Sequence, residues 1–479
     1  MMDARNTGTG IALAVDLDGT LIASDLLYES LFLLLRHNPL FLFLLPVWYW
    51  RGGMALVKDE IAQRVMPDVE HLPYREAVLA GIREARAEGR TVVLATGSAE
   101  RYAQAVAGHL GLFDEVFASC RERSLTAHRK RDLLNERFGE AGYDYMGNAR
   151  PDLVIFDSAR KAIAVAPDRA AASWQARNGG DRIDAPKPGW RTIVKMLRVH
   201  QWLKNTLIAV PMVLSHEYFN PHMIVACLLA FVSFSATASA IYILNDFFDL
   251  TLDRKHATKR NRPFASGQLS IPFGVAAMGV LLTVAVVAAS FLPDLFWLAL
   301  GAYLVATTAY SLSLKRMLLI DVLTLAGLYT MRILAGAAAT DTGVSFWLLA
   351  FSIFFFLSLA LVKRFVELKD TELEEGTRIA GRGYRPEDYE VISQAGLGSA
   401  FAAALVLALY IDSDAVKEMY DTPWLVWPLS PIVLYIILRI WVLARRGEMH
   451  EDPVVFIMRD WRSQLMAALG AALLFFAAW

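Results

Sequence analysis

Long apolar stretches fill the second half of the chain, whereas short apolar runs alternate with charged residues in the first half. A helix needs about 20 apolar residues to cross the hydrocarbon core of a bilayer. Nine stretches reach or approach that length, near residues 194–214, 223–247, 271–291, 294–313, 319–340, 345–365, 391–411, 424–443 and 462–478. The pattern therefore predicts an all-α polytopic membrane domain of about nine transmembrane helices.

The first half has the pattern of a soluble α/β domain. Apolar runs at 11–15, 91–96 and 143–146 are typical of fully buried strands in a parallel sheet. Gly and Pro without periodicity over 174–190 indicate a linker. The expected boundaries are therefore 1–173 for the soluble domain, 174–190 for the linker and 191–479 for the membrane domain.

Residues 26–50 are apolar although they lie in the soluble half. Arg36, Pro39 and Pro46 divide this segment into pieces that are too short to span a bilayer. We predict helices of a cap, over about 22–90, that lie on the membrane surface. A re-entrant or spanning segment is the alternative.

Basic residues gather in the loops on one side of the predicted helices. They are Arg254, Lys255, Lys259, Arg260, Arg262, Lys315, Arg316, Lys363, Arg364, Lys369, Arg378, Arg382, Arg385, Arg445, Arg446 and Arg459. The positive-inside rule makes that side cytoplasmic. Because the N-terminus lacks the pattern of a cleavable signal peptide, we expect the soluble domain on the cytoplasmic side as well.

Composition excludes several classes of protein. The 479 residues are 56% hydrophobic and 20% charged, unlike an average soluble enzyme or a disordered chain. The net charge of −1 predicts no nucleic-acid partner. Two cysteines cannot form a disulfide framework or a thiolate metal cage.

Two carboxylates, Asp16 and Asp18, follow the predicted strand at 11–15. Ligands of open α/β sheets bind at the carboxyl ends of the strands. One carboxylate can attack phosphorus while the other transfers protons, and Mg²⁺ can shield their mutual repulsion. Thr96, Gly97 and Ser98 end the second predicted strand and could hold phosphate oxygens, and Lys130, in a predicted helical stretch, could neutralise the phosphate. The third predicted strand leads to Asn148, with Asp152 four residues beyond.

In this order, these motifs resemble the haloacid dehalogenase (HAD) superfamily over about residues 11–170. The resemblance implies a Rossmannoid parallel sheet with a helical cap. It also implies Asp16 as nucleophile, Asp18 as general acid/base, Thr96 as phosphate binder, Lys130 as charge stabiliser and Asp152 as a carboxylate that supports Mg²⁺. Asn148 stands where the family usually has an acidic residue, although an amide oxygen can still bind a hard cation. A degenerate domain kept for contacts or regulation is the alternative.

The second apolar stretch ends in an N-D-x-x-D-x-x-x-D run, formed by Asn245, Asp246, Asp249 and Asp253. Spacings of three and four predict that the three aspartates share one helix face. Clustered carboxylates at a membrane boundary repel one another unless cations lie beside them. Mg²⁺ bridged to a substrate diphosphate fits this need, and the basic Lys259 and Arg262 follow. The simpler interpretation is a polar helix end beside topology charges.

This run resembles the UbiA superfamily of intramembrane prenyltransferases, over about residues 190–479. Typical aromatic prenyltransferases carry a second D-x-x-x-D-like motif after the sixth span, and LVKRFVELKDTELEEG lacks that pattern. The stretches at 197–205, 310–322 and 329–337 are instead similar to polyprenyl-phosphate phosphoribosyltransferases. Those enzymes transfer from 5-phosphoribosyl diphosphate (PRPP) to a lipid phosphate.

The resemblance implies a set of substrate-binding residues in the membrane domain. They are Lys204, Asn205, Asn245, Lys259, Arg262, Tyr310, Lys315, Arg332, Lys363, Arg364 and Glu367. Most of the charged ones also fit topology or snorkelling roles, and Tyr310 fits an interfacial aromatic belt. Arg332 lies inside an otherwise apolar span, where a functional partner is the default interpretation.

Together these features predict a Mg²⁺-dependent enzyme of the bacterial cytoplasmic membrane. The membrane domain would transfer 5-phosphoribose from PRPP to a polyprenyl phosphate, and the HAD domain would then remove the 5-phosphate. Ordinary prenyl transfer to an aromatic or lipid-precursor acceptor is one alternative. A membrane protein with a regulatory, inactive HAD-like domain is another, and the sequence leaves a homo-oligomer open.

Overall fold

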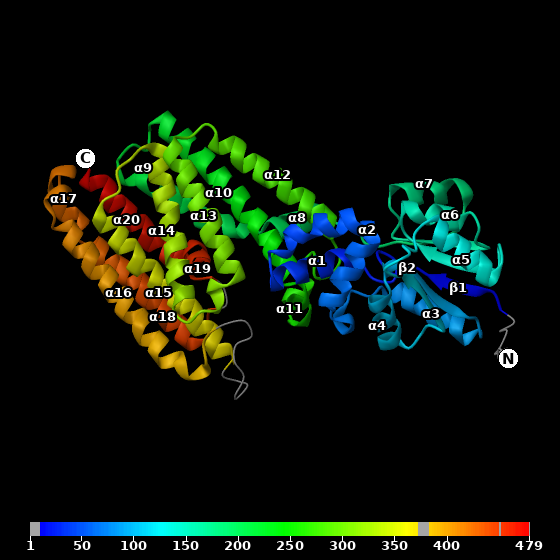
Figure 1. Ribbon diagram of the computed structural model, residues 1–479. Helices are drawn as coiled ribbons and strands as arrows, with labels where there is room; N and C mark the ends of the chain where they lie inside the picture. Colours follow the sequence, from blue (N-terminus) through cyan, green and yellow to red (C-terminus); the bar gives the residue numbers. More distant parts are fainter. Residues whose placement is uncertain (1–9, 372–382, 450–451, 479) are drawn as a thin grey trace. The chain divides into compact units, whose positions relative to one another are not determined.

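The computed structural model describes residues 10–371, 383–449 and 452–478. The chain divides into two compact units, which are described separately (Figure 1). The first comprises residues 1–197 and 242–278, and the second comprises residues 198–241 and 279–479.

The first unit is built on a six-stranded sheet with the order β3-β2-β1-β4-β5-β6, in which all neighbours are parallel. The strands are β1 (Ala12–Val15), β2 (Val92–Ala99), β3 (Glu115–Ser119), β4 (Tyr143–Gly147), β5 (Lys161–Val165) and β6 (Asp181–Ile183). All three predicted strands are present. The parallel sheet expected for the soluble half is therefore confirmed.

Helices cover both faces of this sheet (Figure 1). Leu13 and Val15 pack with α3 (Glu76–Ala87) and α4 (Glu100–Leu110) on one face. Ala12 and Ala14 point the opposite way, because strand side chains alternate. They share a core with helices α5 (His128–Phe138), α6 (Leu153–Phe156) and α7 (Arg169–Asn178).

The expected linker contains ordered structure. Helix α7 runs to Asn178, and β6 extends the sheet by pairing with β5 over Asp181–Ile183. Residues 179–180 and 184–189 lack secondary structure before α8 (Trp190–Leu197). The sequence pattern missed β6 because this three-residue edge strand is mostly exposed and carries little apolar signal.

The apolar segment at 26–50 forms helices, as predicted for the cap. Helix α1 (Leu26–His37) is capped by Asp25, whose side chain accepts from the backbone N–H of Leu27. Helix α2 (Phe41–Arg64) is kinked at Gly52 and Gly53, and a 3-10 helix η1 (Val69–His71) follows. Leu42, Phe43, Tyr49 and Trp50 are exposed, as a membrane-facing surface would require.

Seven helices in the described residues are long and apolar enough to cross a membrane. They are α10 (Pro221–Phe248), α12 (Ile271–Ala289), α13 (Asp294–Leu312), α14 (Ile320–Thr340), α15 (Phe346–Thr371), α16 (Tyr389–Ile411) and α18 (Leu429–Arg446). Shorter helices are α11 (Leu250–Lys255), α17 (Asp414–Met419), α19 (Pro453–Arg459) and the apolar, 17-residue α20 (Trp461–Ala477).

The stretch at 194–214 is not the single helix that we expected. It comprises the end of α8, a 3-10 helix η3 (Val199–Ala209) and the five-residue α9 (Val210–Leu214). Arg198 adopts a left-handed conformation, with φ 51°, and therefore ends α8. Within η3, Lys204 and Asn205 are buried, so this irregular segment brings polar groups into the second unit.

Helix α14 lies against η3 through a glycine. A Cβ atom added at Gly336 would lie 1.9 Å from the carbonyl oxygen of Ile208, so no side chain fits there. Small residues allow such close approach between backbone segments in membrane proteins. Gly336 thereby allows η3, which carries Lys204 and Asn205, to lie directly on α14.

Gly336→Ala should destabilise the protein by about 1–3 kcal/mol, the usual range for overpacking. Gly327→Ala is the matched control, because Gly327 lies in the same helix and an added Cβ meets nothing within 4 Å. Thermal unfolding of the purified protein in detergent measures both variants. Equal unfolding midpoints for the two variants would contradict the proposed close contact.

Candidate functional site

The polar residues predicted at the sheet edge of the first unit converge on Lys130. Its Nζ atom lies 2.8 Å from Asp16 Oδ1, 2.8 Å from the Tyr145 hydroxyl and 3.4 Å from Asp152 Oδ1. All four side chains are buried. Burial opposes the charged form of Lys130, but Asp16 and Asp152 outweigh it and raise the pKa of Lys130. The ammonium therefore stays charged next to the predicted nucleophile.

Asp18 is held by the start of the cap and by β2. Its Oδ1 accepts a hydrogen bond from the backbone N–H of Leu26 at 2.9 Å, and its Oδ2 accepts one from Ser98 Oγ at 2.5 Å. Burial, followed by the charge of Asp25, raises the pKa of Asp18 to about 7. A carboxyl group with a pKa near neutrality is suited to general acid/base catalysis.

Asp152 accepts hydrogen bonds at both of its oxygens. Oδ1 receives the Tyr145 hydroxyl at 2.7 Å, and Oδ2 receives the backbone N–H groups of Asn148 and Ala149 at 3.0 and 3.1 Å. The bonds to Asn148 and Ala149 fix the turn after β4, and the contact of Asp152 with Lys130 Nζ holds the ammonium beside Asp16. They leave Asp152 better suited to orient the site than to bind a cation directly.

Asp16 and Asn148 are the side chains that best fit a metal at this site. The Thr20 hydroxyl lies 3.3 Å from both Asp16 Oδ2 and Asn148 Oδ1, so the two oxygens face the same point. Gly19 has φ 77°, and a Cβ there would lie 2.1 Å from Asn148 Nδ2. A carboxylate and an amide oxygen suit Mg²⁺, although with less charge than two carboxylates would supply.

The residues predicted to bind phosphate, Thr96, Gly97 and Ser98, lie in the last part of β2. Thr96 Oγ1 accepts from the Ser98 backbone N–H at 3.0 Å, and both side chains are buried. The Gly97 carbonyl accepts from Lys58 Nζ at 2.6 Å and from Ser119 Oγ at 2.9 Å. Sequence analysis missed Lys58 because it lies in the cap, without a motif, 39 residues from its partner.

The aspartate motif spans two helices rather than one face of a single helix. Asp246 lies in α10, which ends at Phe248, and Asp253 lies in α11, which begins at Leu250. Asp249 occupies the break, with φ −101° and ψ 6°. The spacing of three and four residues reports only which residues share a face in an unbroken helix, so it could not show this break. Backbone hydrogen bonds continue across it, from Asp249 N–H to Asn245 and from Asp253 N–H to Asp249.

Arg262 bridges the first and third aspartates of the motif. Its Nη1 atom lies 3.2 Å from Asp246 Oδ1 and 2.6 Å from Asp253 Oδ2. Both carboxylates are buried, and burial raises the pKa of Asp253 although Arg262 opposes the shift. Two carboxylates thus converge on a point that a cation can occupy, so the donor set fits Mg²⁺. Asn245 precedes them in α10, and Lys259 lies in the 3-10 helix η4 (Lys259–Asn261).

A second polar cluster lies inside the second unit. Lys204 Nζ is 2.6 Å and Lys363 Nζ is 3.5 Å from Asp452 Oδ2. The Tyr329 hydroxyl donates to Asp452 Oδ1 at 3.2 Å. The ring of Tyr329 also lies beneath two cations, with its centroid 5.5 Å from Lys204 Nζ and 5.5 Å from Arg332 Cζ.

Arg332 and Asn205 complete this cluster. Arg332 Nε donates to Asn205 Oδ1 at 2.8 Å, and Asn205 Nδ2 donates to Ser235 Oγ at 2.9 Å. The structure therefore brings together Lys204, Asn205, Arg332 and Lys363, four members of the substrate-binding set that the resemblance implied. Asp452 was missed because it has the local features of a helix N-cap, and its side chain does accept from the Val454 N–H.

Arg364 is fully buried and belongs to a separate network. Its Nε lies 2.5 Å from Asp321 Oδ2, it pairs with Glu367, and its Nη2 lies 3.3 Å from the Tyr310 hydroxyl. The Tyr384 hydroxyl donates to Asp321. Because its guanidinium is enclosed by protein partners, Arg364 serves the fold, and we leave it out of the proposed substrate contacts. Lys315 lies in η5 (Leu314–Arg316).

Asp321→Asn should destabilise the protein by about 3–5 kcal/mol, because it leaves the buried Arg364 without its only fully buried carboxylate partner among the described residues. Asp412→Asn is the control, since the Asp412–Lys417 pair is exposed and should contribute about 0–1 kcal/mol. Unfolding midpoints in detergent measure both. A midpoint for Asp321→Asn equal to that of the control would refute the structural role of Arg364.

Comparisons with known protein families agree with both halves of this structure. The UbiA prenyltransferase family matches residues 205–463, and the haloacid dehalogenase-like hydrolase family matches residues 13–142. Both resemblances seen in the sequence are therefore confirmed.

Three relatives show how far the similarity extends. Uncharacterized protein y4nM of Sinorhizobium fredii is 38% identical over 469 residues, covering 96% of this chain and 90% of its own length. Nodulation protein NoeC of Azorhizobium caulinodans is 34% identical over 290 residues, covering 60% of this chain and 94% of its own. A decaprenyl-phosphate phosphoribosyltransferase of Mycobacterium tuberculosis is 29% identical over 292 residues, covering 59% and 94%.

Proposed function

The chain belongs to the UbiA prenyltransferase family, and we propose that it transfers 5-phosphoribose from PRPP to a polyprenyl phosphate. The observation that carries this proposal is the cluster around Asp452, where the cations Lys204, Lys363 and Arg332 gather near one carboxylate. Lys204 and Arg332 are buried, and Lys363 is about one-third exposed. Buried positive charge in excess of the carboxylates beside it favours an anionic ligand. A phosphate group of the donor or of the lipid acceptor satisfies that charge.

The aspartate motif is proposed to hold the leaving group. Mg²⁺ bound by Asp246, Asp249 and Asp253 would supply positive charge to the diphosphate of PRPP. Arg262 adds guanidinium N–H donors beside the same carboxylates. A lipid phosphate oxygen forms the new bond to C1 as the bond from C1 to diphosphate breaks. The products are polyprenyl-phosphoryl-5-phosphoribose and diphosphate.

The HAD-like domain is proposed to remove the remaining 5-phosphate. Asp16 attacks phosphorus while Lys130 and Thr96 hold the phosphate oxygens, and Asp18 protonates the departing 5-oxygen. Water deprotonated by Asp18 then hydrolyses the aspartyl phosphate, which releases inorganic phosphate and restores the Asp16 carboxylate. The contact between Lys130 and Asp16 supports these roles. Asn148 reduces the charge available to Mg²⁺, which favours a regulatory domain as the second candidate.

The membrane location follows from the seven long apolar helices and the family. The chain is an integral membrane protein. We propose that both catalytic sites face the cytoplasmic side of the bacterial inner membrane. The basic loops are expected on that side, and the water-soluble donor PRPP would reach the site from the cytoplasm. The proposed partners are PRPP, the lipid phosphate and the bilayer itself.

Asp246→Ala should lower lipid-linked ribose formation by about 100-fold or more, because it removes charge at the leaving diphosphate. Purified protein in detergent is given radiolabelled PRPP with polyprenyl phosphate, and in parallel a labelled prenyl diphosphate. Asp412→Asn, at an exposed pair, is the control. Prenyl transfer without turnover of PRPP would make the chain a prenyltransferase instead.

Asp16→Asn should leave ribosyl transfer intact and cause the 5-phosphorylated lipid to accumulate, because an amide cannot form the aspartyl phosphate. Mass spectrometry of the lipid products compares this variant with the wild type. If both yield only the 5-phosphorylated product, the domain is not a phosphatase for this lipid. The regulatory role would then replace it.

A further inference from the structure

The residue after the last motif aspartate is held by the cap of the HAD-like domain. Arg254 of α11 donates two hydrogen bonds to Glu29 of α1, at 2.6 Å to Oε1 and 2.8 Å to Oε2. Both side chains are buried, with 7% and 6% exposed. A bidentate pair of this kind fixes orientation as well as distance. Figure 1 shows α11 beside the cap helices of the first unit.

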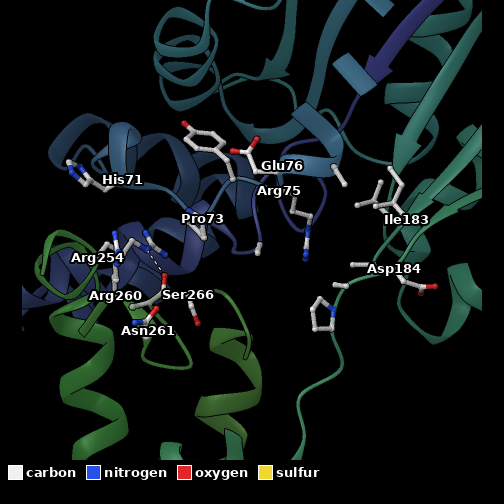
Figure 2. Close-up of a pocket in the computed structure, with 18 residues that line it drawn as sticks. His71, Pro73, Arg75, Glu76, Ile183, Asp184, Arg254, Arg260, Asn261 and Ser266 are labelled. Atoms are coloured by element: carbon white, nitrogen blue, oxygen red, sulfur yellow. Dashed lines mark hydrogen bonds between the residues drawn. The ribbon is translucent and has the colours of Figure 1, made fainter. Parts of the chain in front are cut away.

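Arg254 also reaches the loop that carries Arg262. Its Nε donates to the carbonyl of Ala265 at 3.0 Å, and the same guanidinium lines a pocket of about 490 Å³ with Arg260 and Ser266 (Figure 2). Glu29 thus holds Arg254, and Arg254 holds the loop next to the motif. A shift of this one guanidinium would move both segments.

A second cap residue holds the break between α10 and α11. Arg36 Nη1 donates to the Phe248 carbonyl at 2.7 Å and lies 3.5 Å from Asp249 Oδ1. The last carbonyls of a helix lack intrahelical partners and carry partial negative charge. Phe32 of α1 packs on Phe247, with ring centroids 4.7 Å apart. The cap therefore contacts the motif at its middle as well as at its end.

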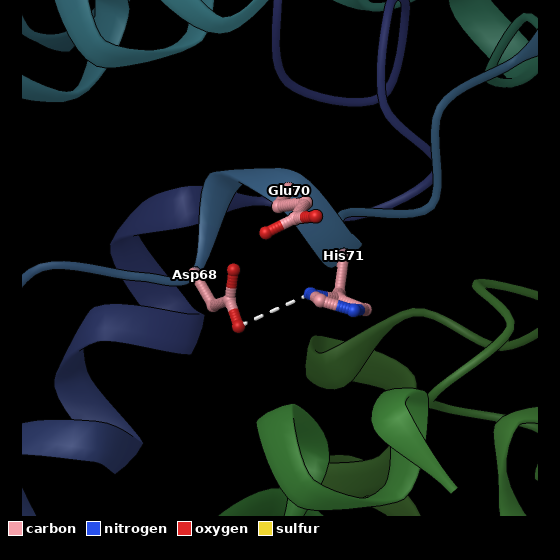
Figure 3. A group of neighbouring side chains, drawn as sticks. All are labelled: Asp68, Glu70 and His71. Carbon is pink, nitrogen blue, oxygen red and sulfur yellow. Dashed lines mark ion pairs between the residues drawn. The ribbon is translucent and has the colours of Figure 1, made fainter.

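A third cap contact involves Asp68, next to η1. Asp68 Oδ2 lies 2.7 Å from Lys255 Nζ and 3.2 Å from His71 Nδ1. Figure 3 shows Asp68, Glu70 and His71 together, an arrangement that could also hold a cation. Because Asp68 already pairs with Lys255, we interpret it as an anchor for the end of α11.

We propose that Glu29, Arg36 and Asp68 are positioning residues for the aspartate motif. The backbone of Asp249 has φ −101° and ψ 6°, so α10 and α11 are separate helices, although hydrogen bonds from Asp249 N–H to Asn245 and from Asp253 N–H to Asp249 continue across the junction. The cap contacts add to these bonds and hold Asp253 where it shares Arg262 with Asp246. This inference rests on the proposed role of the aspartates in holding metal and diphosphate.

The direction of the effect follows from the lost anchor. Without the Glu29 carboxylate, Arg254 is a buried cation that has lost its partner. Helix α11, which carries Asp253, then loses the contact that fixes it to the cap. Loss of Glu29 should therefore weaken metal–diphosphate binding without any change at Asp16.

Glu29→Gln should weaken binding of Mn²⁺ with inorganic diphosphate by about tenfold, within the range found for residues that act through others. The measurement is electron paramagnetic resonance of Mn²⁺ with the full chain in lipid nanodiscs. Every protein carries Asp16→Asn, so that the HAD-like site contributes less signal. Glu60→Gln is the matched control, because Glu60 is also a cap glutamate but pairs with Arg64 within α2.

Exchanging the charges separates positioning from general destabilisation. Glu29→Arg combined with Arg254→Glu restores the pair in reverse and should return the affinity to within about threefold of the wild type. A folded Glu29→Gln variant that binds Mn²⁺ and diphosphate as the control does would overturn the proposal. Absence of binding by the wild type would overturn the proposed role of the aspartates together with it.

Asp68→Asn keeps the test decisive if Glu29→Gln does not fold. The Asp68–Lys255 pair is more exposed, with side chains 22% and 50% accessible, so its loss should be tolerated. We expect a smaller weakening of the same sign. Unchanged binding by this folded variant would then overturn the proposal.

Discussion

The removal of charged groups from water is the constraint on which the rest of this structure depends. A buried ion without a partner costs several kcal/mol, so each one requires an opposite charge that is often distant in sequence. Lys130 meets Asp16 from 114 residues away, and Arg254 meets Glu29 from 225 residues away. These pairs determine which helices and loops lie together at both candidate sites. The functional side chains are placed by the same contacts.

Features encoded locally could be predicted from the sequence. The buried strands, the carboxylates of Asp16 and Asp18, the aspartate motif and most of the long apolar helices each depend on residues that are near neighbours in the chain. Hydrophobic periodicity and short motifs report this kind of structure. The same methods missed β6, an exposed edge strand, and the break at Asp249, which local spacing conceals.

The partners of the buried charges could not be predicted. Asp452 looks like an N-cap, Asp321 like a polar residue at a helix start, and Glu29 like one acidic residue in an apolar helix. The residues next to each carboxylate in the sequence do not indicate which cation it pairs with, because tertiary packing determines that pairing. Arg364 is an example: it was proposed as a substrate-binding residue because its partners could not be predicted, whereas the structure pairs it with Asp321 and Glu367.

The two interpretations of the HAD-like domain need not exclude each other. The proposed hydrolysis would depend on a metal held by Asp16 and Asn148, and an amide oxygen supplies less charge than a carboxylate. The proposed support of the aspartate motif rests on Glu29, Arg36 and Asp68, which lie in or beside the cap and require no metal. A substitution at 148 could therefore impair the first role while leaving the second intact. A domain whose cap fixes the neighbouring motif would be retained for that contact even where its own chemistry is slow.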